Sequence, residues 1–241
     1  MRLRTALDNP ASKRVYVRRL FATIADRYDL ITVLLSFGLD RGWKSRLIAL
    51  AAPLDGKSAL DLACGTGDIS FALAERGASV LGLDITRRMV EIAAAKGAPG
   101  PERRVPSPRF VVGDMMTLPF GDAQFDVVTT GYGLRNVPEL SGAIAEIHRV
   151  LRPDGLLLSL DFNRPENPLV RGVYLFYLTV VGSVLGWLLH RDPDTYRYIP
   201  QSIIRYPGAP AVTGMMRRHG FSAAEWLPVL GGLMAIHVAK K

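Results

Sequence analysis

Short apolar runs separated by amphipathic segments dominate the chain from residue 57 onward, and this alternation constrains the fold more than any other feature. A helix predicted over residues 86–97 begins at Thr86 and ends at Gly97, two residue types that favour helix ends. Another follows Pro138 and stops before Gly155. The predicted strands are residues 58–63, 79–84, 109–114, 125–130 and 155–162. Alternating strands and helices predict an α/β fold with a doubly wound parallel sheet and helices on both faces.

Two regions outside the alternation complete the predicted architecture. Residues 15–52 carry apolar side chains near helical spacing, which indicates an N-terminal helical cap. A helix near residues 209–219 precedes two strands joined by a Leu-Gly-Gly turn, which is typical of an antiparallel pair. Together with the five parallel strands, this pair predicts a seven-stranded, mostly parallel sheet.

A glycine turn and two acidic strand ends predict a nucleoside site. In DLACGTGD (residues 61–68), Gly65 and Gly67 let the backbone turn tightly and approach a ligand. Asp84 ends the second strand, where a carboxylate accepts hydrogen bonds from ribose hydroxyls, and Asp114 ends the third, beside an expected adenine edge. Ligands of open α/β sheets bind beyond the carboxyl ends of the strands, where all these residues fall.

The residues around the turn favour a cationic ligand without phosphate. A dinucleotide fingerprint requires a third glycine where the chain has Ser70, and no G-x-x-x-x-G-K-[ST] pattern occurs. Asp61 and Asp68 flank the turn and suit an amino group. S-adenosylmethionine carries a sulfonium, an ammonium, a ribose and an adenine, so we favour it over NAD as the cofactor. The alternative role for both carboxylates is capping of the following helix.

Five stretches resemble the ubiquinone/menaquinone biosynthesis C-methyltransferase family, a group of class I methyltransferases with a Rossmann-like fold. The resemblance implies that Thr66, Asp84, Asp114, Met115 and Gly131 contact the cofactor, beside the turn residues already named. The chain departs from the usual family pattern at Ile31 and Thr32 (Met-Asn), Asp40 (His), Cys64 (Gly) and Gly131 (Ser). The five stretches are YDLITVLLSFGLDRGWK (28–44), LDLACGTGD (60–68), FDVVTTGYGLRNV (125–137), RVLRPDG (149–155) and DPDTYRYIPQSI (192–203).

The resemblance also implies a reaction: C-methylation of a prenylated hydroquinone, with demethylmenaquinol favoured over the ubiquinone precursor. Another lipophilic small molecule, such as a phospholipid amine, is the alternative substrate. We expect Arg135 to stabilise the developing phenolate and Asn136 to orient a water or a ring oxygen. The structural alternatives are that Arg135 pairs with Asp161 and that Asn136 stabilises the start of the next helix. The tyrosines expected to line the substrate pocket are Tyr28, Tyr132 and Tyr196.

Charge and cysteine content limit the kinds of binding partner that the sequence predicts. A net charge of +8 suggests an anionic partner. No Asp-Pro-Pro-Tyr motif follows the fourth strand, and the single cysteine, Cys64, lies in the glycine turn, so we expect no nucleic-acid substrate. The four histidines show no metal-binding spacing, and we expect no metal. The basic residues 1–19 favour a solvated, frayed terminus over a dedicated binding arm. The sequence leaves the oligomeric state open, with a homodimer as one alternative.

Residues 173–189 contain no charged side chain, yet a membrane span there conflicts with the predicted sheet. A span would put the last two strands across the bilayer from the first five. We therefore expect a lid that receives an isoprenoid tail and touches the membrane surface, in a cytoplasmic protein without a secretory signal. The single domain would divide into a helical cap (1–52), a cofactor-binding half (53–162), a lid insert (163–207) and a C-terminal helix and strand pair (208–241).

Overall fold

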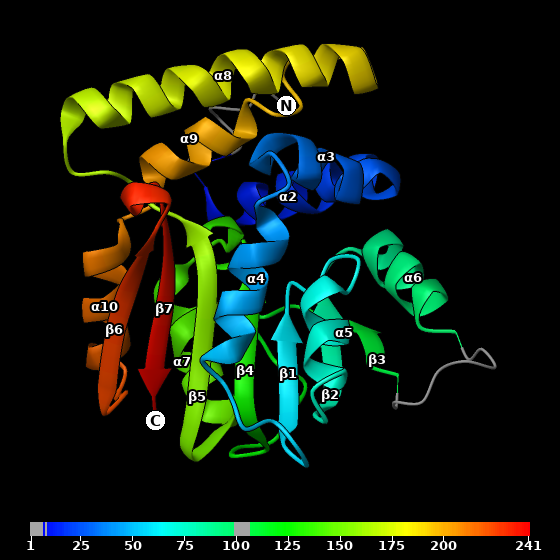
Figure 1. Ribbon diagram of the computed structural model, residues 1–241, viewed down its shortest axis with the longest axis vertical. Coiled ribbons are helices and arrows are strands. Elements are labelled where there is room, and N and C mark those ends of the chain that lie inside the picture. Colours follow the sequence, from blue (N-terminus) through cyan, green and yellow to red (C-terminus); the bar gives the residue numbers. More distant parts are fainter. Residues whose placement is uncertain (1–6, 8, 99–106) are drawn as a thin grey trace.

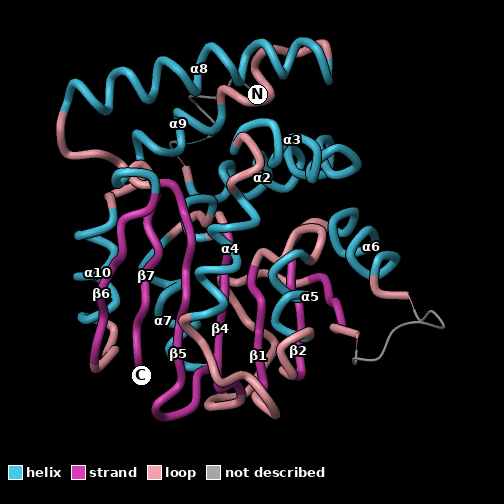
Figure 2. Tube along the Cα trace, viewed as in Figure 1, coloured by secondary structure: helices cyan, strands magenta, loops and turns pink. Residues whose placement is uncertain are grey.

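The computed structural model describes residues 7, 9–98 and 107–241, and these form a sheet covered by helices (Figures 1 and 2). The sheet has seven strands in the order β3-β2-β1-β4-β5-β7-β6. Strands β1 to β5 are parallel, and β7 runs antiparallel to both β5 and β6, which confirms the predicted fold class. The strands are β1 (Ser58–Leu62), β2 (Ser79–Asp84), β3 (Arg109–Val112), β4 (Phe125–Gly131), β5 (Leu151–Phe162), β6 (Ala223–Val229) and β7 (Met234–Lys240).

Helices pack on both faces of the sheet because successive strand residues point to opposite faces. Val128 contributes to the apolar core beneath α7 and α10, whereas its neighbour Val127 contributes to the core beneath α4 and α5. The helices that cover the two faces are α4 (Asp40–Ala49), α5 (Asp68–Ala74), α6 (Arg87–Lys96), α7 (Leu140–Val150) and α10 (Ala209–Arg218).

The predicted boundary between α7 and β5 is wrong by several residues. The helix ends at Val150, and β5 begins at Leu151 rather than at Gly155. Leu151 is fully buried and already pairs with Phe125 of β4, so tertiary pairing ends the helix early. The third strand also ends sooner than predicted, at Val112, because Asp114 turns the chain by accepting a hydrogen bond from the backbone N–H of Met116 at 2.9 Å.

Helices from the N-terminal region and from the insert after β5 cover the carboxyl ends of the parallel strands (Figure 1). From the N-terminal region come α2 (Pro10–Ile24), the 3₁₀ turn η1 (Ala25–Arg27) and α3 (Tyr28–Ser36). From the insert after β5 come α8 (Pro168–His190) and α9 (Tyr198–Arg205). The turns η2 (Leu134–Asn136) and η3 (Leu230–Gly232) complete the elements. The covering helices create the enclosed space in which the site lies.

Helix α8 is long and apolar enough to cross a membrane by length and composition alone. Its two ends nevertheless connect to strands of one sheet, β5 before it and β6 and β7 after it, as the sequence argument required. One stripe of the helix, at Tyr174, Leu178, Gly182 and Gly186, is buried. A Cβ at Gly186 would lie 2.5 Å from the Asp192 carbonyl oxygen, so the glycine permits close packing of the segment that follows the helix.

The prediction of a solvated, frayed N-terminus is wrong about the fraying in the described part of residues 1–19, although Arg14, Arg18 and Arg19 are exposed to solvent. Asn9 caps α2, and its Oδ1 accepts a hydrogen bond from the backbone N–H of Ala11 at 2.9 Å. Lys13 donates to the carbonyl oxygens of Arg135, at 3.1 Å, and Val137, at 2.6 Å. From Pro10 onward the basic segment is therefore an ordered helix that contacts the loop after β4. Arg2 and Arg4, also counted in that prediction, lie outside the described residues.

Candidate active site

A cavity lies at the carboxyl ends of β1, β2 and β4. Its position matches the crevice in which open α/β sheets bind ligands. The predicted cofactor residues on its wall are Gly65, Asp84, Asp114, Met115 and Gly131. A smaller hollow adjoins the glycine turn and has Asp61, Thr66 and Asp68 on its wall. Gly67 lies in the same turn but lines neither space.

The glycine turn adopts the left-handed backbone conformation that glycine favours. The φ angles of Gly65 and Gly67 are 54° and 93°. A Cβ at Gly67 would lie 2.8 Å from a ring carbon of Phe71. Cys64, where the family usually has glycine, fits as a buried side chain, and burial raises the pKa of its thiol. The turn therefore brings the backbone of Gly65 to the cavity wall without a side chain at that position.

Asp84 is held rigidly at the end of β2. Its carboxylate accepts hydrogen bonds from the backbone N–H groups of Gly65, at 3.0 Å, and Thr86, at 2.7 Å. Burial raises the pKa of Asp84, and these two hydrogen bonds oppose the shift. Because a carboxylate has about four lone-pair sites, the side chain retains capacity for the hydroxyls of a ribose.

Asp61 is buried at the end of β1. It accepts hydrogen bonds from the hydroxyls of Ser70, at 2.6 Å, and Thr129, at 2.8 Å. Burial raises the pKa of Asp61 to about 6, because the two hydrogen bonds offset only part of the desolvation. A cation bound beside this carboxylate would favour its charged form. Asp61 therefore lies in a fixed position on the wall of the smaller hollow, with a pKa that a neighbouring cation would lower.

Two other predicted cofactor residues have partners from the N-terminal helices. Asp114 forms an ion pair with Arg14 of α2 at 2.7 Å. The Thr66 hydroxyl donates to Asp29 of α3 at 2.5 Å. The N-terminal helices therefore form part of the wall of the cofactor cavity. Neither Arg14 nor Asp29 was predicted from the sequence.

Gly131 stands where the family usually has serine, and a side chain at this position would first meet the terminal methyl group of Ile69. A Cβ at this position would lie 2.7 Å from the Cδ1 atom of Ile69 on α5. Without a side chain, Gly131 leaves room on the cavity wall and avoids this contact with α5.

The donors and acceptors on the wall of the cofactor cavity fit the ribose, the ammonium group and the adenine of S-adenosylmethionine, and no phosphate-binding fingerprint is present.

A second and larger cavity lies between the N-terminal helices and the insert. Its wall is mostly apolar and aromatic, which is typical of a small-molecule site. Phe21, Tyr28 and Tyr132 line both this cavity and the cofactor cavity, so the two spaces meet at these side chains. Tyr196 also lines the larger cavity, and its hydroxyl lies 2.9 Å from Nε2 of His190.

Arg135 lies on the wall of the larger cavity and pairs with Asp161, the structural alternative raised by the sequence. Its Nε lies 3.2 Å from Asp161 Oδ1, and its backbone N–H donates to Oδ2 at 3.0 Å. A further hydrogen bond joins the guanidinium to Ser202 of α9. Its central carbon lies 4.9 Å from the centre of the Phe162 ring. The guanidinium is therefore fixed beside the cavity, with one carboxylate to balance its charge.

Both ends of the Asn136 amide have protein partners. Its Nδ2 donates to the carbonyl oxygen of Tyr132 at 2.7 Å, and its Oδ1 accepts from the Tyr198 hydroxyl at 2.8 Å. Asn136 also lines the cofactor cavity. The side chain thus ties the loop after β4 to helix α9, and this arrangement suits a residue that fixes the shape of the site.

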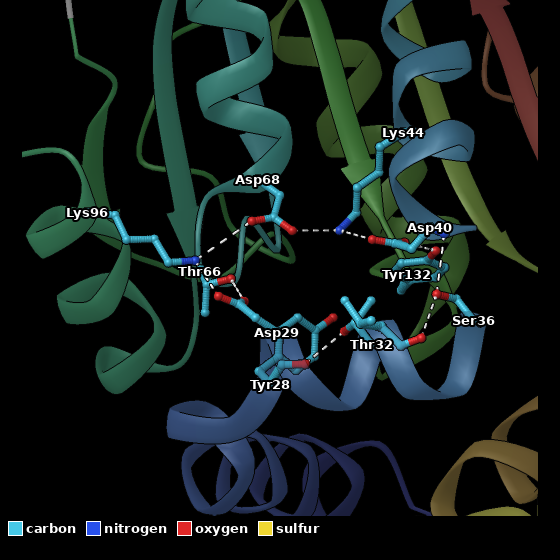
Figure 3. Close-up of polar contacts among 11 residues, drawn as sticks. Tyr28, Asp29, Thr32, Ser36, Asp40, Lys44, Thr66, Asp68, Lys96 and Tyr132 are labelled. Atoms are coloured by element: carbon cyan, nitrogen blue, oxygen red, sulfur yellow. Dashed lines mark hydrogen bonds and ion pairs between the residues drawn. The ribbon is translucent and has the colours of Figure 1, made fainter. Parts of the chain in front are cut away.

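A chain of polar contacts around α4 was missed by the sequence analysis (Figure 3). Lys44 lies 2.6 Å from Asp40 and 2.9 Å from Asp68. Lys96 of α6 lies 2.6 Å from Asp29. The spacing of Asp40 and Lys44 is a recognisable helix pair, but nothing local in the sequence indicates the contacts with other elements.

Among the described residues, no group of three or more His, Cys, Asp or Glu side chains could hold a metal ion. The polar groups instead surround a space suited to a nucleoside and a cation, beside an apolar cavity. The fold and the site together define a class I methyltransferase that uses S-adenosylmethionine.

Comparison with known proteins identifies the family. The ubiE/COQ5 methyltransferase family matches residues 9–241, and the chain therefore belongs to this family, which confirms the resemblance seen in the motifs. The demethylmenaquinone methyltransferase of Thermus thermophilus is 40% identical over 224 residues, covering 92% of this chain and 100% of the relative. The ubiquinone/menaquinone biosynthesis C-methyltransferase of Paracoccus denitrificans is 36% identical over 223 residues, covering 92% and 88%.

Solved structures show the same fold at low sequence identity. Magnesium protoporphyrin IX methyltransferase from Synechocystis PCC 6803, solved with bound S-adenosylmethionine, has a TM-score of 0.57 and is 20% identical. The similarity covers 84% of this chain and 79% of the other. This likeness supports the class I methyltransferase architecture.

Proposed function

We propose that this protein methylates a ring carbon of a prenylated hydroquinone, with demethylmenaquinol as the favoured substrate. The observation that carries the proposal is the apolar cavity that meets the cofactor cavity at Phe21, Tyr28 and Tyr132. An aromatic head group fits between such rings, and an isoprenoid chain requires a long apolar wall. The names of the Thermus and Paracoccus relatives support the same substrate class.

The wall of the cavity supplies the electrostatics that the reaction needs. When bound, S-adenosylmethionine supplies a methyl group on a cationic sulfur. Ring carbon becomes nucleophilic as a neighbouring hydroxyl loses its proton, and the Arg135 guanidinium lowers the energy of the resulting oxyanion. Asp161 holds the guanidinium in place and balances part of its charge. The apolar walls exclude water, which strengthens these interactions.

The lid is proposed to face the membrane from which such a substrate comes. Many apolar side chains of α8 are exposed, including Phe176 at 71% and Trp187 at 62%. Phe37, at the end of α3, stacks on Tyr177 of α8 with 6.3 Å between ring centres, so apolar surface continues from one helix to the other. Phe37 and Tyr177 also line the larger cavity. We place the protein in the cytoplasm, with this surface on the inner face of the membrane.

A substrate panel tests the proposed reaction. The purified enzyme is given labelled S-adenosylmethionine with short-chain demethylmenaquinol, a reduced demethylated benzoquinone precursor, or phosphatidylethanolamine in detergent. We expect methyl transfer to the naphthoquinol and little to the lipid amine. Transfer to the lipid amine alone would replace the proposal with the alternative substrate class.

Flotation with liposomes tests the membrane surface. We expect the wild-type protein to float with vesicles containing anionic lipid at moderate salt, and Phe176→Glu with Trp187→Glu to remain at the bottom. Leu50→Glu, at the C-terminal cap of α4, is the matched control because it changes an exposed leucine outside the lid. Equal flotation of the lid variant and the control would reject this surface.

A further inference from the structure

Tyr132 occupies the junction between the two cavities, and its backbone is fixed there. Its φ angle is 61°, a conformation that a bulky residue rarely adopts. The backbone N–H donates to the Leu160 carbonyl oxygen at 2.7 Å, and the carbonyl oxygen accepts from Asn136. The ring lies 5.6 Å from that of Phe162, between ring centres. The surrounding structure thus holds Tyr132 in an unfavourable backbone conformation, which is common at functional sites.

The Tyr132 hydroxyl donates a hydrogen bond to Oδ1 of Asp40, a residue 92 positions earlier in the chain (Figure 3). Asp40 is 3% exposed at the start of α4. Its other carboxylate oxygen lies 2.6 Å from Lys44, and its backbone N–H donates to the Ser36 hydroxyl at 3.3 Å. A buried carboxylate is thereby connected, through one phenol, to the place where cofactor and substrate meet.

We propose that Tyr132 accepts a hydrogen bond from the hydroxyl of the bound quinol and passes its proton to Asp40. Tyr132 would then be a catalytic residue in contact with substrate, and Asp40 a positioning residue that acts through it. This inference rests on the proposed function. A phenol suits the task because its oxygen donates one hydrogen bond and accepts another.

The proton balance closes with these two side chains. The quinol O–H bond breaks as its proton moves to the Tyr132 oxygen, while the Tyr132 proton moves to Asp40, leaving a quinolate and a neutral Asp40. The methyl group then joins the ring carbon as its bond to sulfur breaks, and the electron pair of that bond stays on sulfur. The proton on the methylated carbon moves through water to the ring oxygen. The proton held by Asp40 leaves to solvent, and one proton is released overall.

The surroundings suit transmission of a proton by Tyr132 without its own ionisation. Burial, and then the nearby Asp40 carboxylate, raise the pKa of Tyr132 well above its usual range, so it stays protonated at rest. Lys44 stays cationic beside Asp40: burial lowers its pKa, but Asp68 and Asp40 raise it overall. The titratable groups around Asp40 are Lys44 on its own helix, Tyr132 after β4, Tyr28 on α3 and, beyond Lys44, Asp68 on α5.

The test compares Tyr132→Phe and Asp40→Asn with Tyr206→Phe. Tyr206 is a matched control, since its buried hydroxyl has no hydrogen-bond partner among the described residues and it lines neither cavity. Methyl transfer to short-chain demethylmenaquinol is measured from pH 6 to 9, with melting temperature and cofactor affinity measured by calorimetry. We expect kcat to fall about 100-fold at pH 7 in both test variants, the lower end for general acid–base catalysis. Cofactor affinity should change less than threefold.

The pH profile separates proton transfer from a structural role. The loss should shrink as pH rises in both test variants, because the quinol then ionises without help, whereas Tyr206→Phe should follow the wild-type profile. Turnover of Tyr132→Phe within threefold of wild type, or a loss that stays constant with pH, would overturn the inference. If the wild-type enzyme and Tyr206→Phe methylate no quinol, the proposed function fails as well, so the two failures are distinguishable.

Discussion

Replacing Arg135 with alanine should destabilise the protein strongly, because it leaves a buried carboxylate without its cation. Arg135 is 5% exposed and Asp161 is 1% exposed. Removing one partner of a buried ion pair costs about 3–5 kcal/mol. In a chain of this size about 1 kcal/mol shifts the melting temperature by roughly 2–4 °C, so we expect a decrease of about 10 °C.

The charge of Asp161 is the reason for this loss of stability, so the titration of Asp161 determines how the loss changes with pH. Burial raises the pKa of Asp161 although Arg135 lowers it, and without Arg135 the pKa should rise further. A carboxyl whose pKa is higher in the folded state favours folding in its protonated form. The loss in free energy of unfolding caused by Arg135→Ala should therefore be smallest in acid and grow as pH rises through the folded-state pKa of Asp161.

Urea unfolding of the wild type, Arg135→Ala, Asp161→Asn and the double variant measures the effect. The double variant should recover much of the stability, because no buried charge remains. Arg135→Ala within about 1 kcal/mol of wild type, or a double variant no more stable than Arg135→Ala, would refute the reasoning. If the double variant folds and binds cofactor but does not turn over, the guanidinium acts on the reaction itself.

Three further substitutions test the cofactor side of the site. The cofactor affinity of the wild type, measured by calorimetry, should fall as pH drops below the Asp61 pKa of about 6. Asp61→Asn should remove this pH dependence. A flat wild-type profile would contradict the expectation. Gly131→Ser should lower stability by about 1 kcal/mol in thermal melts, because the Cδ1 methyl group of Ile69 must move to make room. Ile69→Val should restore part of this stability, and an unchanged melt would argue against the clash. Lys13→Met should lower stability by about 1–3 kcal/mol, since two carbonyl oxygens after β4 lose a donor, and a neutral result in urea would dismiss this contact.

Local sequence patterns predicted the sheet, the glycine turn and the acidic strand ends. Strands and helices alternate along the chain. Gly65 and Gly67 fall where the turn requires a left-handed backbone. Such features depend on neighbours in sequence, so they can be read without the fold. The boundary at Leu151 was missed because pairing with Phe125 of β4, a contact between distant residues, overrides the helical pattern.

The sequence by itself thus determined the class of fold, the cofactor and the return of the chain to one sheet after the apolar helix. Only the tertiary structure decided which groups share the site. Asp40 meets Tyr132, Arg135 meets Asp161 and Arg14 meets Asp114 across separate elements. These side chains are brought together by the packing of helices over the ends of the strands. Periodicity sets which face of an element is apolar, but packing sets which side chains touch, and the chemistry depends on those contacts.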